Sequence, residues 1–403
     1  MGQVRGARGR TWTRGAGAAI MRGAVASAEV DARTAFLDRH PWPEALRAGG
    51  GAPVEWLWRF EVAARAEAIW RQLTDSSRLN RALGLGRMEL AEEGGLLRGV
   101  GVNGGFRQEW VEEPWTWVAG RGFALVRRYS RGFARVVRVI VEVEGRGATS
   151  EVRVYFGWIP RGVLGRVMLW LGEGSMRGAY TRVLAALARE AEAERPKIYQ
   201  LAPPALEAGA QARLSAARAE LARRGLAAAA IDRLLAHLEG ADELELPRLQ
   251  VLALARRWGL DAGELLRVFL HATRLGILRL SWDVVCPHCR GVREAVDLLA
   301  KVPAGGRCDA CEIEFGTGDP SSIEITFHVH PAVRSVQEQF YCSAEPATKA
   351  HIKVQQPVAA GATVTIAPLL AAGRYRLRIR GRMEVRRVDV DPADAGRRAR
   401  RPR

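Results

Sequence analysis

Four of the five cysteines in this chain lie in two short motifs of identical spacing, Cys286-Pro-His-Cys289 and Cys308-Asp-Ala-Cys311. Each C-x2-C motif forms a tight turn that directs two thiolates to one side, and two such turns complete a tetrahedral set of four sulfur ligands. Eighteen residues separate the motifs, which is typical of a zinc ribbon. Because four thiolates leave no position for water or substrate, we expect Cys286, Cys289, Cys308 and Cys311 to bind one structural Zn²⁺.

Two disulfides or four free thiols are the alternatives to a metal site. Disulfides persist in oxidising compartments, but the first thirty residues lack the leucine-rich core of a secretion signal and carry Arg22 within their small-residue stretch. No apolar run reaches the roughly 18 residues of a membrane helix. We therefore predict a cytoplasmic protein with no membrane span. His288 could replace a cysteine as a ligand, but with four thiols available we expect it to lie outside the shell.

The net charge of +17 is concentrated at the two ends of the chain. Residues 1–22 carry +5 and residues 374–403 carry +8, so the body between them is nearly balanced. This distribution argues against a broad DNA-binding surface. We expect a disordered Gly- and Arg-rich leader at residues 1–52 and a disordered basic tail at residues 391–403.

Residues 53–195 have the pattern of an α+β domain. A strand-like stretch at 54–62 precedes a helical segment, and short strands separated by glycine turns follow from 88 to 158. The valines from 137 to 143 alternate with charged residues, so one face of the sheet is buried. After Pro160 we expect a long amphipathic helix from 163 to 194. Its predicted apolar side consists of Leu164, Val167, Met168, Leu171, Val183, Leu184 and Leu187.

This order of elements resembles the START-like helix-grip fold of the SRPBCC superfamily. The resemblance implies an apolar cavity between the sheet and the last helix that binds an apolar small molecule. The inward residues that would line it are Trp110, Val139, Val154, Phe156 and Trp158. A core filled by side chains is the alternative, since nine of the twelve tryptophans lie between Trp42 and Trp170. The acids of this region alternate onto exposed faces, so we expect no catalytic constellation.

The remainder is predicted to form smaller segments. They are a linker and helical pair at 196–244, a helix-turn-helix-like (winged-helix-like) segment at 245–285, the zinc ribbon at 286–315 and a small β-sandwich-like segment at 321–390. A winged-helix/zinc-ribbon DNA-binding transcriptional regulator is the alternative function. The outward residues of its second helix, Glu264, Arg267, His271 and Arg274, include few groups that recognise bases. A second metal site at His328 and His330, with His351 or Cys342, is a further alternative.

The order of these segments resembles the non-catalytic N-terminal region of bacterial class III adenylate/guanylate cyclases. The most specific resemblance lies between Leu246 and Phe315, where Leu280-Ser-Trp-Asp-Val-Val-Cys286-Pro-His-Cys289-Arg290 occurs. Such cyclases need two metal-binding aspartates, one in a Phe-Thr-Asp-like strand, and the chain has no such strand. The resemblance implies a non-catalytic regulatory or ligand-sensing protein whose partner is a cyclase or another signalling protein.

Overall fold

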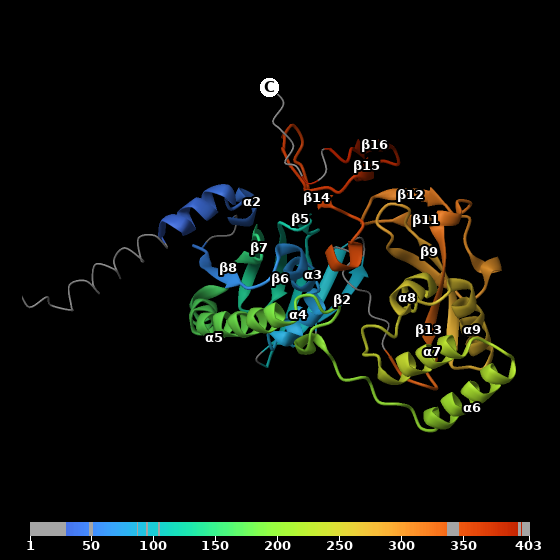
Figure 1. Cartoon of the computed structure of the whole chain (residues 1–403). Coiled ribbons are helices and arrows are strands. Elements are labelled where there is room, and N and C mark those ends of the chain that lie inside the picture. Colours follow the sequence, from blue (N-terminus) through green and yellow to red (C-terminus); the bar gives the residue numbers. More distant parts are fainter. Residues whose placement is uncertain are drawn as a thin grey trace, which may run out of the picture. The chain divides into compact units, whose positions relative to one another are not determined.

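The computed structural model describes residues 30–47, 51–86, 88–93, 96–103, 105–336, 346–393 and 396. The chain divides into two compact units, residues 1–53 and 54–403. Each is described by itself, with the element labels of Figure 1.

The first unit contains helices where the sequence predicts a disordered leader. Residues 30–39 are helical, and α2 covers Glu44–Arg47. The rings of Phe36 and His40 lie 4.8 Å apart, at the i, i+4 spacing that stabilises a helix. Part of the stretch for which the sequence predicts a disordered leader is therefore helical, while residues 1–29 and 48–50 of that stretch lie outside the described residues.

A large antiparallel sheet organises the second unit. Its main path is β1-β8-β7-β6-β4-β3-β2, while β5 pairs with β6 and β14 pairs with β5 (Figure 1). The strands are Val54–Val62 (β1), Met88–Glu93 (β2), Leu96–Asn103 (β3), Phe106–Glu112 (β4), Thr116–Val118 (β5), Gly122–Arg131 (β6), Ala134–Arg146 (β7), Thr149–Pro160 (β8) and Val354–Gln355 (β14). The alternation seen in the sequence fixes one face, since Val139 lies opposite Phe156 and Val141 lies opposite Val154.

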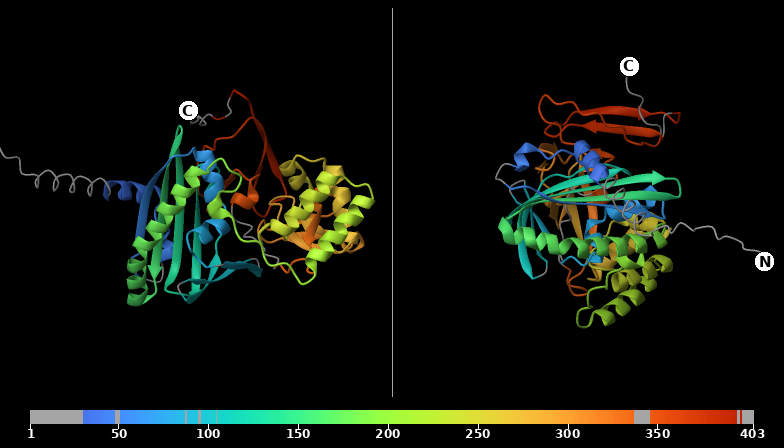
Figure 2. Two further views of the ribbon diagram at one scale, coloured as in Figure 1. Left: turned by 60° about the horizontal axis from the view of Figure 1, so that its bottom comes forward. Right: turned by 90° about the vertical axis from the view of Figure 1, so that its left-hand side faces the viewer.

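Three helices complete this part of the unit. The helices α3 (Ala66–Leu73) and α4 (Ser76–Ala82) follow β1, and α5 (Gly162–Arg189) follows β8 and runs alongside the sheet (Figure 2). The buried core between sheet and helix includes Trp58, Val154, Val183 and Leu187. The predicted α+β architecture, with an antiparallel sheet and a long closing helix in a helix-grip arrangement, is confirmed.

Only the second half of α5 has the buried apolar side that the sequence predicts. Val183, Leu184 and Leu187 are at most 2% exposed, whereas Leu164 and Leu171 are 74% and 62% exposed. Val167 and Met168 are exposed as well, and so is Trp170. The spacing of apolar residues identifies a stripe on a helix, but it does not show how much of the helix a sheet covers.

Four helices and a three-stranded sheet form the next part of the unit. The helices α6 (Ala210–Arg223), α7 (Ala228–Gly240), α8 (Val251–Trp258) and α9 (Ala262–Arg274) share one core with β9 (Leu278–Val285) and β13 (Ile323–Val329). The sheet order is β10-β9-β13, with β10 at Val292–Val296. Gly259, with a φ of 67°, ends α8 in the left-handed conformation, and Asp261 caps α9 through the backbone N–H of Glu264 at 2.8 Å. These two helices lie within the segment 245–285 that the sequence predicts to be helix-turn-helix-like.

The segment from 321 to 390 does not form the predicted β-sandwich among its described residues. β13 pairs with β9, β14 joins the large sheet, and β15 (Gly373–Arg378) pairs with β16 (Val385–Val390) as a separate hairpin. Alternating residues predict strands but not their partners, and here the partners lie far away in the sequence. Most of the predicted basic tail, residues 391–403, lies outside the described residues.

No described helix combines the length and the apolar character needed to cross a lipid bilayer.

Candidate functional site

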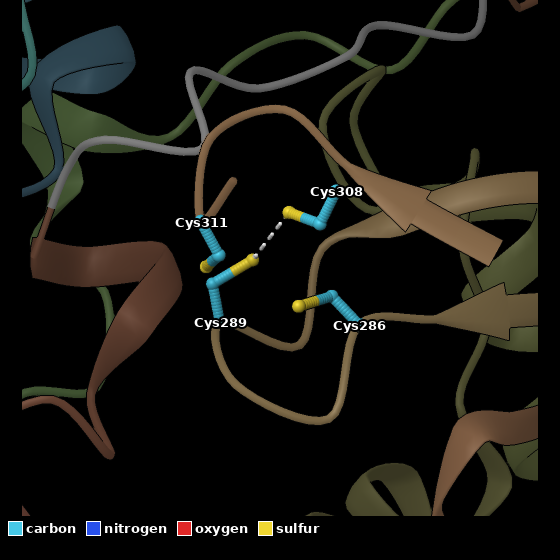
Figure 3. A group of neighbouring side chains, drawn as sticks. All are labelled: Cys286, Cys289, Cys308 and Cys311. Atoms are coloured by element: carbon cyan, nitrogen blue, oxygen red, sulfur yellow. Dashed lines mark hydrogen bonds between the residues drawn. The ribbon is translucent and has the colours of Figure 1, made fainter. Parts of the chain in front are cut away.

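The four motif cysteines converge on one point. Their sulfur atoms all lie within 4.8 Å of one another, and the Sγ atoms of Cys289 and Cys308 are 3.8 Å apart (Figure 3). A Zn–S bond of about 2.3 Å in a regular tetrahedron gives an S···S edge of about 3.8 Å. Cys286, Cys289 and Cys308 are buried and Cys311 is partly so. The donor set and its spacing therefore fit a single metal ion with four thiolate ligands.

The two motifs share one backbone feature, a left-handed residue directly after the second cysteine. The first follows β9, and the second joins β11 (Gly305–Cys308) to β12 (Ile313–Gly316). The residue after each second cysteine is left-handed, with a φ of 61° at Arg290 and 54° at Glu312. In the first motif the N–H groups of His288 and Gly291 each donate to a cysteine sulfur at 3.4 Å. Neither Arg nor Glu favours this conformation, so the sequence gives no direct signal of it.

The close thiols titrate together. The pKa of Cys289 is lowered because its thiolate accepts hydrogen bonds from Cys286 and Cys308. The pKa of Cys311 is raised by its hydrogen bonds to Cys286, Cys289 and Cys308. The first proton therefore leaves the cluster easily and the last one with difficulty. A bound divalent cation favours loss of all four.

Basic side chains from remote segments surround the sulfur cluster. Lys349, at the end of the 3₁₀ helix η4 (Pro346–Lys349), is only 5% exposed. Burial lowers the pKa of Lys349, and the Cys289 thiolate is the largest influence in the opposite direction. Arg378 donates to the carbonyl of His288, and Arg293 interacts electrostatically with Cys308. A tetrathiolate–Zn²⁺ centre carries a net charge of about −2, so these cations offset it. Sequence analysis did not identify them.

The histidines do not form part of a metal centre. His288 contributes its backbone groups, as described above. Ser281 Oγ lies 2.7 Å from Nε2 of His328, and Nδ1 of His330 accepts the N–H of Ala332. Across the described residues, the four cysteines are the only group of three or more potential metal-binding side chains. The second site predicted at His328 and His330 is therefore not formed by them, and Cys342 lies outside the described residues.

The residues predicted to line a ligand cavity belong to one face of the sheet. Val154 is fully buried, and Val139, Phe156 and Trp158 are half-buried against the same apolar cluster. Trp110 is buried farther along the sheet, where its ring packs against Tyr129 at 5.7 Å. The structure thus brings four of the five predicted residues together and places Trp110 in a separate group.

Three tryptophans of this face bury N–H groups that have no acceptor in the described part of the chain. They are Trp56, Trp58 and Trp158. Trp56 lies 5.6 Å from Trp58 and 5.5 Å from Trp158, measured between ring centroids. A buried donor without a partner costs about 1–3 kcal/mol. Three such donors in one cluster can pair with an acceptor supplied by water or by a ligand.

A buried carboxylate corrects the prediction that the acids of the domain are exposed. Glu112 is 4% exposed. It accepts hydrogen bonds from Nε1 of Trp115 at 2.6 Å, Nε1 of Trp110 at 3.2 Å and Nε of Arg127 at 2.8 Å. Burial opposes the charge of Arg127, but the Glu112 carboxylate outweighs it and raises the pKa of Arg127. The alternation of side chains along β4 puts Glu112 on the inner face of the sheet, so this pattern could have identified Glu112 as buried.

The exposed face of α9 bears on the DNA-binding alternative. Glu264, Arg267, Leu270 and Arg274 are exposed, and His271 lies 2.8 Å from Nη1 of Arg224. This face carries an acid and a leucine beside its two arginines, and DNA binding stays an untested alternative.

Comparisons with known proteins match two separate parts of the chain. Residues 210–350, which include α6 to α9 and the four cysteines, match the model of a family of unknown function (DUF5939). No curated protein matches the chain.

Matches to solved structures cover about a third of the chain. Zhui aromatase/cyclase from Streptomyces sp. R1128 is 15% identical with a TM-score of 0.30, over 36% of this chain and 98% of that one. The protein TTHA0849 from Thermus thermophilus is 19% identical with a TM-score of 0.28, over 35% and 98%. A Thalictrum flavum norcoclaurine synthase point mutant in complex with a transition state analogue is 16% identical with a TM-score of 0.29, over 36% and 99%.

Proposed function

We propose that this chain is a non-catalytic, ligand-sensing regulatory protein. Its helix-grip domain binds an apolar small molecule, and its ribbon is held by one structural Zn²⁺. The observation that carries the ligand proposal is the cluster of three buried indole N–H groups without acceptors at Trp56, Trp58 and Trp158.

The chemistry of this face defines the ligand. Aromatic and aliphatic side chains surround the three indoles, including Phe156 and Val154, so the body of the ligand is apolar. The unpaired donors require at least one acceptor, such as a carbonyl or hydroxyl oxygen. An apolar molecule with an oxygen at one end satisfies both conditions.

Binding accounts for this face better than catalysis does. The carboxylate of Glu112 already accepts three hydrogen bonds, from Trp110, Trp115 and Arg127. A general base must be able to reach the proton that it removes, and a carboxylate occupied in this way is held in place as a structural anion. We therefore assign no catalytic role to the domain.

The metal identity follows from ligand chemistry. Four thiolates at tetrahedral spacing suit Zn²⁺, and the closed shell suits a structural role. The surrounding cations Lys349, Arg293 and Arg378 lower the net charge of the thiolates and make them poorer nucleophiles. We infer a zinc site that stabilises the ribbon and performs no chemistry.

The regulatory part of the proposal rests on the resemblance to the N-terminal region of class III cyclases. The partner would be a cyclase or another signalling protein, to which a ligand-dependent change in the first domain is passed through the helices. The cytoplasm, as a reducing compartment, fits the free cysteines.

Native mass spectrometry of the protein purified from its own host tests both binding claims at once. We expect one zinc and a retained apolar ligand per chain. Trp158→Phe removes one indole N–H and should weaken ligand binding about fivefold to tenfold. Trp170→Phe, at a tryptophan that is 72% exposed on α5, is the matched control. A zinc-loaded chain that retains no ligand and binds none from a library of oxygenated apolar molecules would refute the sensing proposal.

A further inference from the structure

A second site lies in a cleft beside the zinc ribbon, and we propose that it binds a small molecule through phosphate groups. The cleft has a volume of about 1110 Å³, enough for a ligand of nucleotide size. It is lined by residues of the β2–β3 hairpin, of the segment from Leu244 to Arg256, of the stretch from Arg290 to Ala295, of the second cysteine motif with β11, of β13 and of the residues around η4. This inference is independent of the ligand proposed for the helix-grip domain.

Cations outnumber carboxylates on the walls of the cleft. Six basic side chains line it, namely Arg248, Arg256, Arg290, Arg293, Arg307 and Lys349. Four acids line it, namely Glu92, Asp283, Asp309 and Glu324. The fixed charge of the lining is therefore positive before any histidine is counted.

Each acid is already paired with one arginine. The nitrogen–oxygen distances are 3.0 Å for Arg293–Glu92, 2.8 Å for Arg248–Asp283, 2.9 Å for Arg307–Asp309 and 3.5 Å for Arg290–Glu324. Two basic side chains of the lining, Arg256 and Lys349, have no such acidic partner in the described part of the chain. Among the described residues, neither has a carboxylate within ion-pair distance, and Nε of Arg256 donates to the carbonyl of Leu252 at 3.1 Å in its own helix.

The burial of Lys349 is the second observation that points to an anion. Its side chain lines the cleft although the residue is only 5% exposed, and a buried ammonium is costly unless negative charge lies near it. The sulfur cluster supplies part of that charge. Lys349 thereby also reduces the repulsion that the metal centre would exert on an anion in the cleft.

His328 also lines the cleft. Its Nδ1 faces the carbonyl of Pro247, which can only accept. Its Nε2 faces Ser281 Oγ at 2.7 Å, and the single hydroxyl proton of Ser281 is donated to Asp283 at 2.7 Å. Asp283 also accepts from Thr326 and Arg248. Both ring nitrogens of His328 are therefore engaged within the protein, so the arginines and Lys349 supply the positive charge of the cleft.

Guanidinium groups favour ligands with paired oxygens. Arginine binds phosphate through two parallel hydrogen bonds, and the arginines of the cleft come from several of its walls. A ligand with more than one phosphate group would meet Arg256 on one side and Lys349 on another. We therefore assign the cleft to phosphorylated small molecules or to inorganic polyphosphate.

Calorimetry with the zinc-loaded full chain tests this assignment, using inorganic triphosphate at about 50 mM salt. We expect binding that weakens as salt is raised. Arg256→Gln should reduce the affinity about tenfold, because a charged hydrogen bond is lost. Arg267→Gln, at an exposed arginine of α9 outside the cleft, is the matched control and should bind as the parent chain does.

Three outcomes would overturn the proposal. One is the absence of triphosphate binding at millimolar concentration, and another is an equal loss of affinity in Arg256→Gln and Arg267→Gln. The third is equal binding of citrate, which would show a general response to negative charge. Unchanged zinc content and circular dichroism in both variants exclude misfolding as the cause of any difference.

Discussion

Arg78 and Asp242 form a buried, two-point ion pair between segments 164 residues apart. Their nitrogen–oxygen distances are 2.7 and 3.0 Å, and their side chains are 6% and 3% exposed. Arg78 belongs to α4 beside the sheet, and Asp242 follows α7. Arg78 also donates to the carbonyl of Tyr199 at 2.8 Å. The pair therefore provides a direct connection between the helix-grip domain and the helices, which the proposed signalling role requires.

Arg78→Ala should lower the free energy of unfolding by about 3–5 kcal/mol, because it leaves the Asp242 carboxylate buried without its main partner. Urea denaturation measures the change. Arg65→Ala is the control, since the ion pair of Arg65 with Glu192 is 63% and 67% exposed and is expected to contribute less than about 1 kcal/mol. Equal losses in the two variants would contradict the importance of the buried pair.

Protonation of Glu245 in acid should lower the stability of the same region. Burial alone would raise the pKa of Glu245, but hydrogen bonds from Arg195 and Arg257 outweigh it and lower the pKa to about 2. The unfolded value is about 4.3. Glu245 therefore stabilises the fold above about pH 4.5, and this contribution is lost as the pH falls toward 2. Glu245→Gln should be less stable than the parent chain at neutral pH, and the difference should shrink in acid. A difference that stays constant with pH would refute this account.

Removal of one metal ligand should release zinc and unfold the ribbon. Cys308→Ser is expected to lower zinc affinity by more than about 100-fold, beyond the usual effect of losing a residue that only contacts a ligand. Competition with a chromogenic chelator measures the affinity. Cys342→Ser, at the fifth cysteine, should keep one zinc per chain. If Cys308→Ser binds zinc as tightly as the parent chain, the four-sulfur centre is incorrect.

A side chain at position 99 should destabilise the fold. A Cβ atom there would lie 2.1 Å from the ring of Trp110, so Gly99→Ala must displace that ring. The expected cost is about 1–3 kcal/mol, measured by thermal unfolding. Gly172→Ala is a matched control within α5, where nothing lies within 4 Å of the added atom. It should be neutral or stabilise the chain by up to about 1 kcal/mol. A neutral Gly99→Ala would contradict the position of Trp110.

The features that the sequence predicts are those encoded locally. The four motif cysteines lie within 26 residues, and the spacing of their two motifs predicts that their sulfur atoms meet. The alternation of valines in β7 and β8 gives the buried face, because side chains of a strand have a period of two.

The features that the sequence does not predict depend on distant partners. Lys349 approaches the cysteines, and Asp242 approaches Arg78, only because the fold is complete. The strand at Val354–Gln355 pairs with Thr116–Val118 in the large sheet, which no local pattern indicates. The exposure of the first half of α5 also depends on distant residues, because the extent of the neighbouring sheet decides how much of the helix is buried.

Arg290 and Glu312, the left-handed residues that follow the two cysteine motifs, bear on which changes of sequence this segment can accept. Two loops of unlike sequence place a left-handed residue directly after their second cysteine, so this feature follows from the C-x2-C spacing rather than from the residues between the cysteines. A chain in which Pro287-His288 and Asp309-Ala310 exchange places should still assemble the same four-sulfur shell.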